Sequence, residues 1–190
     1  MKQELWKEER VKKLNPVDAT RYRAITARGI YLAQDRSDIQ YAVKEISRHQ
    51  QNPTNENWEA IKRFGRYLVG KTRYTTEYKY QRNPGKMICY TDTDFAGCRI
   101  TRKSTSGGVI MHGEHVIKTW SSNQAVIALS SGEAEYYGIV RGATHAIGYK
   151  SLLYDMGVHP ATISVRTDAT AAIGIANRRG CGQIWHIDTR

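Results

Sequence analysis

Cysteine is scarce in this sequence, and long apolar runs are absent. Cys89, Cys98 and Cys181 lie far from any Cys-x-x-Cys or Cys/His spacing, which argues against a disulfide scaffold and against a structural zinc site. A reducing, intracellular setting fits this cysteine usage best. No apolar run approaches the roughly 18 residues that cross a bilayer, and the charged start MKQELWKEERVKK lacks a signal-peptide core. Neither secretion nor membrane insertion is expected.

Acidic residues are few compared with basic ones. The chain has 29 Lys and Arg against 18 Asp and Glu, a net charge of +11, so an acidic partner such as nucleic acid is expected. The excess is uneven, because residues 1–86 carry a net charge of +9 and residues 87–190 one of +2. Asn83-Pro84-Gly85 is a strong turn signal at this point. The pattern predicts a helical segment, 1–86, followed by a second domain, 87–190.

The first segment contains three amphipathic patterns. Asp18 is predicted to cap a helix that runs to about Gln34, Ser37 to cap a second, and Pro53-Thr54 to open a third. The third presents Lys62, Arg63 and Arg66 away from its apolar side. Two interpretations of this basic face stay open: contact with nucleic-acid phosphates, or simple solvation.

The second segment changes to short β-type runs and two helices. The predicted elements, in chain order, are a strand Met87–Asp92, a hairpin of Gly108–His112 with His115–Trp120, a helix from Ser130 to Met156-Gly157, a strand Ala161–Thr167 and a short helix after Asp168. Ser130 and Glu133 have the spacing of a capping box. This order predicts an α/β fold, with a mixed sheet and flanking helices.

Three acids are expected to converge in this fold. Asp92 and Asp168 each follow a strand, and parallel neighbouring strands joined through a helix bring such residues to one sheet edge. A glutamate of the long helix can join them. Three converging carboxylates repel one another unless cations lie between them, and oxygen ligands suit Mg²⁺. The chemistry indicated is phosphoryl transfer with two metal ions about 3.5–4 Å apart.

Helical phase distinguishes the two glutamates of this helix. Glu135 lies near the end of the buried stripe, whereas Glu133 points elsewhere and fits a capping role. Asp94, two residues after Asp92, is a candidate either for a further ligand or for a supporting role beside the ligands. A second interpretation stays open from spacing alone: Asp168 as a helix cap, Asp92 in a solvated turn, and the glutamates as partners of the helix dipole.

Several ordered motifs carry a resemblance to a known family. YTDTDFAGCRITRKSTSGG, KTWSSNQAVIALSSGEAEY, VRTDATAAIGIAN and HIDTR resemble the ribonuclease H domain of copia-type retrotransposon Pol polyproteins. YRAITARGIYLAQDRSDIQYAVKEISRHQQNPTNENWEAIKRFGRYLVGKTRY resembles the connection segment between reverse transcriptase and that domain. The chain has no Asp-Asp pair and therefore no polymerase signature.

The resemblance implies a ribonuclease H fold in which Asp92, Glu135 and Asp168 hold two Mg²⁺ ions, with Mn²⁺ as a substitute. It also implies an endonuclease that cuts the RNA strand of an RNA/DNA hybrid during reverse transcription. The implied partners are that hybrid and the remainder of a Pol polyprotein, in a cytoplasmic virus-like particle or the nucleus. The sequence departs from the family pattern at four places without losing a carboxylate: Thr93, Phe95, Gly132 and Thr167–Ala169.

The family's fourth acid has no match before the chain stops at Arg190. Asp188 is a poor match for it and is kept as a candidate for a supporting role. An incomplete domain is therefore expected, which binds a hybrid but cuts it poorly, and the alternative is a non-catalytic nucleic-acid-binding fragment of a retroelement. Polar side chains are further candidates for contacts to the RNA 2′-hydroxyl, namely Ser104, Ser106 and Asn123.

Overall fold

The chain divides into two compact units. The computed structural model describes residues 11–159 and 162–178, and its chain separates into an N-terminal unit, residues 1–77, and a C-terminal unit, residues 78–190. This division lies nine residues before the boundary predicted from sequence. Counted by these units, residues 1–77 carry 16 basic and 10 acidic side chains, and residues 78–190 carry 13 and 8. The net charges, +6 and +5, are therefore nearly equal.

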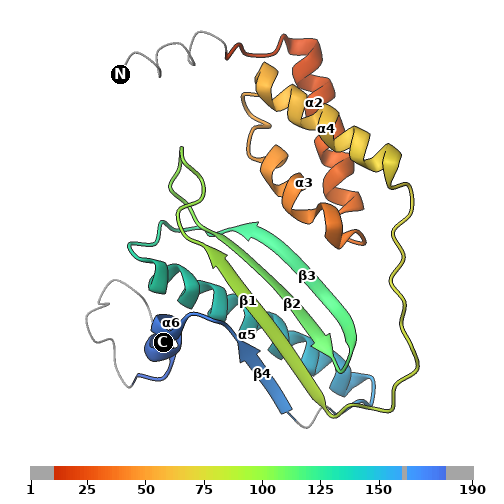
Figure 1. Ribbon diagram of the computed structural model, residues 1–190, viewed down its shortest axis with the longest axis vertical. Coiled ribbons are helices and arrows are strands. Elements are labelled where there is room, and N and C mark those ends of the chain that lie inside the picture. The colour runs from red at the N-terminus through yellow and green to blue at the C-terminus, as the bar shows by residue number, and fades with distance from the viewer. Residues whose placement is uncertain (1–10, 160–161, 179–190) are drawn as a thin grey trace. The chain divides into compact units, whose positions relative to one another are not determined.

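The N-terminal unit is helical. Its elements are α2 (Pro16–Leu32), the 3₁₀ turn η1 (Ser37–Ile39), α3 (Gln40–Ser47) and α4 (Asn55–Gly70) (Figure 1). Large side chains from all of them form one core: Tyr22, Ile39, Val43, Ile46, Ile61 and Phe64. Gly29 of α2 lets the helices approach closely, since a Cβ there would lie 3.3 Å from Val43 and 3.4 Å from Phe64.

Two of the three predicted helix starts are corrected by the structure. Asn15, not Asp18, caps α2, because its side chain accepts a 2.8 Å hydrogen bond from the Asp18 N–H while Pro16 occupies the first helical turn. Ser37 makes no capping bond; its hydroxyl lies 2.7 Å from that of Tyr74. The third prediction is confirmed, since Thr54 caps α4 in a capping box.

A four-stranded sheet organises the C-terminal unit. Its strands are β1 (Lys86–Asp94), β2 (Thr105–His112), β3 (His115–Asn123) and β4 (Thr162–Arg166), in the order β3-β2-β1-β4. β1 pairs antiparallel with β2 and parallel with β4. Two helices flank the sheet, α5 (Ser131–Asp155) and α6 (Thr170–Ala176) (Figure 1). The predicted α/β fold class is confirmed, and the arrangement is consistent with a ribonuclease H-like fold.

Strand β1 alternates strictly between its two faces. Met87, Cys89, Thr91 and Thr93 are buried on the side of α5, and the residues between them point the other way. Glycines of α5 make the helix lie close to this strand, because a Cβ at Gly138 would come 2.5 Å from the Thr93 hydroxyl. The depth of this packing decides how far side chains of α5 reach past the end of the sheet.

No helix within residues 11–159 and 162–178 is long and apolar enough to cross a membrane.

Candidate metal centre at the ends of β1 and β4

The three acids singled out from the sequence lie together. Asp92 belongs to β1, Asp168 follows β4, and Glu135 belongs to α5. One carboxylate oxygen from each lies within 4.8 Å of the other two. Asp92 and Asp168 are exposed and Glu135 is half-buried, so the cluster opens to solvent.

The parallel pairing of β1 and β4 explains this meeting. Their ladder ends at the pair Tyr90 and Arg166, and each aspartate lies two residues further along its own strand direction. Carboxyl ends of parallel strands share one sheet edge, so both aspartates reach the same point. Past this pair, no strand of the described residues pairs with β1 on that edge, and the backbone of Thr93 interacts with the Glu135 carboxylate there.

The neighbouring glutamate has a different task. Glu133 is 2% exposed, and its Oε2 accepts a 2.8 Å hydrogen bond from the Leu129 N–H. Its own N–H donates to the Ser130 Oγ at 3.2 Å. Glu133 therefore stabilises the start of α5, which agrees with its predicted capping role, and Glu135 is the glutamate that faces the aspartates. The phase argument itself is wrong, because the buried stripe of α5 runs through Ala134, Gly138, Gly142 and Ala146 and Glu133 is buried beside it.

The electrostatics of the cluster fit a cation. Burial, followed by the charges of Asp92 and Asp168, raises the pKa of Glu135, while the hydrogen bond from Thr93 lowers it. The Oε2 of Glu135 is buried and has no partner among the described residues. Within those residues neither aspartate forms an ion pair. Unneutralised carboxylate oxygens at this spacing are the donor set that Mg²⁺ or Mn²⁺ prefers.

Asp168 does not cap the helix that follows it. The cap position of α6 is Ala169, which makes no side-chain capping bond, and the Ala169 N–H bonds to the Thr167 hydroxyl at 3.3 Å. The capping interpretation of Asp168 is therefore wrong, and its carboxylate faces the cluster.

Asp94 is not one of the three acids of this cluster. Asp94 is the exposed last residue of β1, and its carboxylate lies against Gly97, which has no side chain to displace it. Asp188 lies outside the described residues. A supporting role for either one stays a prediction.

Two of the predicted nucleic-acid contacts are corrected. Ser104 is 0% exposed and its hydroxyl accepts a 3.0 Å hydrogen bond from the Ala96 N–H. Ser106 is 1% exposed and accepts a 2.9 Å bond from Gln124. Both hydroxyls form hydrogen bonds inside the protein, so they cannot contact a ligand. Asn123 is exposed at the end of β3, where its role stays a prediction.

The basic candidates belong to the N-terminal unit. Lys62, Arg63 and Arg66 are all exposed on α4. Lys62 forms a 2.6 Å ion pair with Glu59, which reduces the charge it offers to a ligand. Their contact with nucleic acid stays a prediction.

A buried polar network supports the cluster from inside, and sequence analysis missed it. Gln124, at the end of β3, donates to the Ala134 carbonyl at 2.7 Å and to Ser106. The Ser106 hydroxyl lies 3.5 Å from that of Thr93, whose backbone holds Glu135. The network connects three strands to the turn of α5 that carries the glutamate. No local pattern marks Gln124, because its partners lie on other elements.

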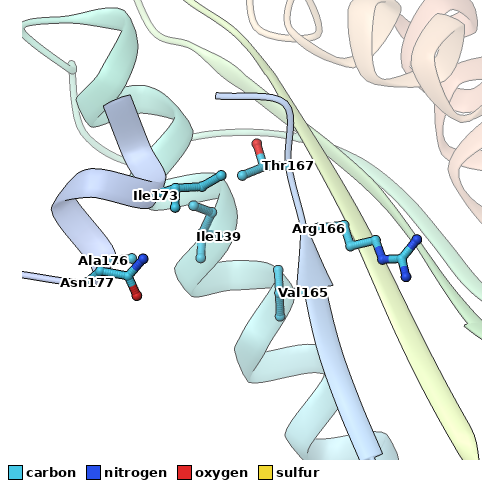
Figure 2. Close-up of a pocket in the computed structure, with 7 residues that line it drawn as sticks. All are labelled: Ile139, Val165, Arg166, Thr167, Ile173, Ala176 and Asn177. Carbon is cyan, nitrogen blue, oxygen red and sulfur yellow. The ribbon is translucent and has the colours of Figure 1, made fainter. Parts of the chain in front are cut away.

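A cavity of about 440 Å³ opens between α5, β4 and α6. Its walls are mainly apolar, from Ile139, Val165, Ile173 and Ala176, with Arg166, Thr167 and Asn177 at polar positions (Figure 2). None of the three clustered acids lines it. The cavity is therefore separate from the acidic cluster and offers mainly apolar contacts.

Comparison with known proteins gives a consistent set of relatives. The retrovirus-related Pol polyprotein from transposon RE2 of Arabidopsis thaliana is 35% identical over 149 residues, 77% of this chain and 10% of that protein. That from transposon RE1 of the same plant is 36% identical over 141 residues, 74% of this chain and 10% of that protein. The Pol polyprotein from transposon TNT 1-94 of Nicotiana tabacum is 33% identical over 166 residues, which are 82% of this chain and 12% of that protein. The chain thus spans about a tenth of these relatives. No family model and no solved structure matches it.

Proposed function

The chain belongs to the family of retrovirus-related Pol polyproteins from copia-type transposons, and we propose that its C-terminal unit is a Mg²⁺-dependent ribonuclease H. Its substrate is the RNA strand of an RNA/DNA hybrid formed during reverse transcription. Its other partner is the remainder of a Pol polyprotein, inside a cytoplasmic virus-like particle or the nucleus. The observation that carries this proposal is the meeting of Asp92, Glu135 and Asp168 within 4.8 Å.

Each of the three acids has a distinct position toward a bound metal. Asp92 and Asp168 offer exposed oxygens from the ends of two strands, so they are the ligands open to solvent and substrate. Glu135 approaches from α5, where the backbone of Thr93 favours its charged form. Two bound divalent ions would supply an activated water and stabilisation of the leaving oxygen. Mn²⁺ would take the same oxygen ligands.

Charge counting over the described residues favours weak turnover. Three carboxylates offer three negative charges against four from two divalent ions, so the scissile phosphate has to contribute to binding of the second ion. This deficit is the specific observation behind a second candidate function, a nucleic-acid-binding fragment that holds a hybrid without cutting it.

The test separates metal binding from cleavage. Mn²⁺ binding is measured by electron paramagnetic resonance, and cleavage is followed on a hybrid with a labelled RNA strand in Mg²⁺ or Mn²⁺. We expect Mn²⁺ binding and slow RNA cleavage, both lost in Asp92→Asn and both kept in Asp155→Asn, an exposed acid at the far end of α5. Metal and hybrid binding without cleavage would favour the second candidate. A wild-type chain that binds no Mn²⁺ would overturn the proposed metal centre.

A further inference from the structure

Arg166 is an exposed arginine beside the acidic cluster that neutralises none of its members. It is the last paired residue of β4, directly opposite Tyr90 of β1. Its guanidinium carbon lies 5.8 Å from the centre of the Tyr90 ring. Across the residues that the structure describes, Arg166 forms no ion pair with a carboxylate. An aromatic ring, and not an acid, therefore holds this guanidinium.

Arg166 lies on the same face of the sheet as Asp92. Directly paired residues of parallel strands share a face, and so do residues two apart in one strand. Figure 2 shows the Arg166 side chain pointing to the opposite side of β4 from Val165, although Arg166 is also among the residues that line the cavity. Two residues of a strand span about 6.6 Å, which is the order of the distance between neighbouring phosphates of one nucleic-acid strand.

The chemistry of the side chain suits a phosphodiester. A guanidinium is planar, always charged and less strongly hydrated than an ammonium, and it donates two parallel hydrogen bonds to a phosphate. Because Arg166 forms no ion pair among the described residues, its N–H groups are available to donate to a phosphate. Because the ring keeps the guanidinium in place before the ligand arrives, little side-chain entropy is lost on binding.

We propose that Arg166, held by Tyr90, binds the backbone phosphate next to the one that the acidic cluster acts on. This inference rests on the proposed function of that cluster and adds an anchor that sets the register of the strand. The contact reads the phosphate and not the base, so it is independent of sequence. Both residues stand two positions before an acid, Tyr90 before Asp92 and Arg166 before Asp168, so one strand geometry places the anchor and the cluster together.

The first experiment measures hybrid binding without cleavage. Fluorescence anisotropy gives the Kd of a labelled RNA/DNA hybrid in buffer without divalent ions, over a series of salt concentrations. In Arg166→Gln we expect Kd to rise about tenfold and the slope of log Kd against log salt to fall by about 0.9, the value for one phosphate contact. Arg166→Lys should keep the slope and still weaken binding, because an ammonium does not bind a phosphate in two-point fashion.

Lys150→Gln is the matched control. Lys150 stacks on Tyr154 at the same 5.8 Å distance, but toward the other end of α5, and its loss should leave both Kd and slope unchanged. A second pair of variants tests whether the aromatic ring of Tyr90 positions Arg166. Tyr90→Phe should bind the hybrid as the wild type does, and Tyr90→Leu should weaken hybrid binding as Arg166→Gln does.

A hybrid with one neutral methylphosphonate linkage then locates the contact. Wild type should lose affinity when the linkage occupies one position in the RNA strand, and Arg166→Gln should be insensitive to that position. Unchanged Kd and slope in Arg166→Gln would overturn the anchor while leaving the metal centre intact. A wild-type chain that binds no hybrid would overturn the proposed function and the anchor together.

Discussion

The two units of this chain carry nearly the same net charge but have different interiors. The N-terminal unit buries large apolar side chains such as Tyr22, Ile39 and Phe64 in a single core. The C-terminal unit buries a smaller apolar set together with Thr93, Gln124 and Glu133. Both units bury polar residues, but the two differ in whether those groups find partners. Every buried polar side-chain atom without a partner in the described ranges belongs to the C-terminal unit.

This contrast indicates which of the two units carries a functional site. Buried polar groups without partners cost free energy and are rare in ordinary cores, so a unit that keeps them is often one with a site. Glu135 is such a residue, since its unpartnered oxygen lies in the acidic cluster. Charge does not make the distinction: with the division at residue 77, attraction to nucleic acid is expected of both units.

The largest expected effect tests the polar character of the C-terminal unit. Glu135→Gln should lower Mn²⁺ affinity by more than about 100-fold, because even the partners of metal ligands contribute 10–100-fold. Glu133→Gln is the matched control two residues away. Its amide oxygen can still accept the bond from Leu129, so Mn²⁺ affinity should be unchanged. Calorimetric titration measures both, and equal losses in the two variants would contradict the assignment of Glu135.

The second largest expected effect is a loss of stability when the close packing of α5 against β1 is disturbed. In Gly142→Ala the new Cβ would collide with Thr91 and crowd Cys89, whose sulfur lies 3.0 Å away, so the C-terminal unit should lose about 1–3 kcal/mol of stability. Gly148→Ala, on the same helix, meets nothing within 4 Å and should gain up to about 1 kcal/mol from helix propensity.

Hydrogen–deuterium exchange can assign these two effects to one unit. We expect faster exchange in β1 for Gly142→Ala and unchanged exchange in α4. Faster exchange in both would show that the two units do not unfold independently, and stabilisation by Gly142→Ala would contradict the close packing.

The basic face of α4 gives a smaller effect. Replacing Lys62, Arg63 and Arg66 by Gln together should reduce the salt slope of hybrid binding by about 2, if each unpaired cation neutralises one phosphate. Lys62 should contribute least because of its ion pair with Glu59. Glu59→Gln should therefore make the slope steeper. Unchanged slopes in both variants would show that this face is only solvated.

The smallest effect concerns pH and the N-terminal unit. A bidentate hydrogen bond from Arg36, at 2.9 and 2.7 Å, together with the Tyr67 hydroxyl, holds the pKa of Asp38 below its usual range against the effect of burial. A lowered pKa in the folded state stabilises the unit above pH about 4, and this stabilisation is lost as pH falls through the folded value.

Asp38→Asn should therefore flatten the acid branch of the stability curve for this unit. Urea denaturation between about pH 5 and 2 measures it, and Asp35→Asn, an exposed aspartate on the same loop, is the control. An identical acid branch in wild type and Asp38→Asn would contradict the contribution of this pair.

Much of the site was predictable because it depends on regular geometry. Alternation in MICYTD and in ISVRT, joined through one long helix, predicts two parallel strands whose ends bring Asp92 and Asp168 together. The same alternation contained the signal for Tyr90 and Arg166, each two residues before an acid, although the sequence analysis did not use it. Ser104 and Ser106 were misjudged because polar residues near a turn suggest exposure.

The sequence by itself determined the α/β class, the approximate positions of most helices and strands, and the three candidate acids, because periodicity and capping act between residues a few positions apart. Only the tertiary structure decided which hydroxyls are buried, how closely Gly138 lets α5 approach β1, and that Tyr90 holds Arg166. These contacts join residues from different elements, and Gln124 shows the reason most clearly. Its side chain reaches β2 and α5 at once, so its role exists only when the chain has brought the three elements together.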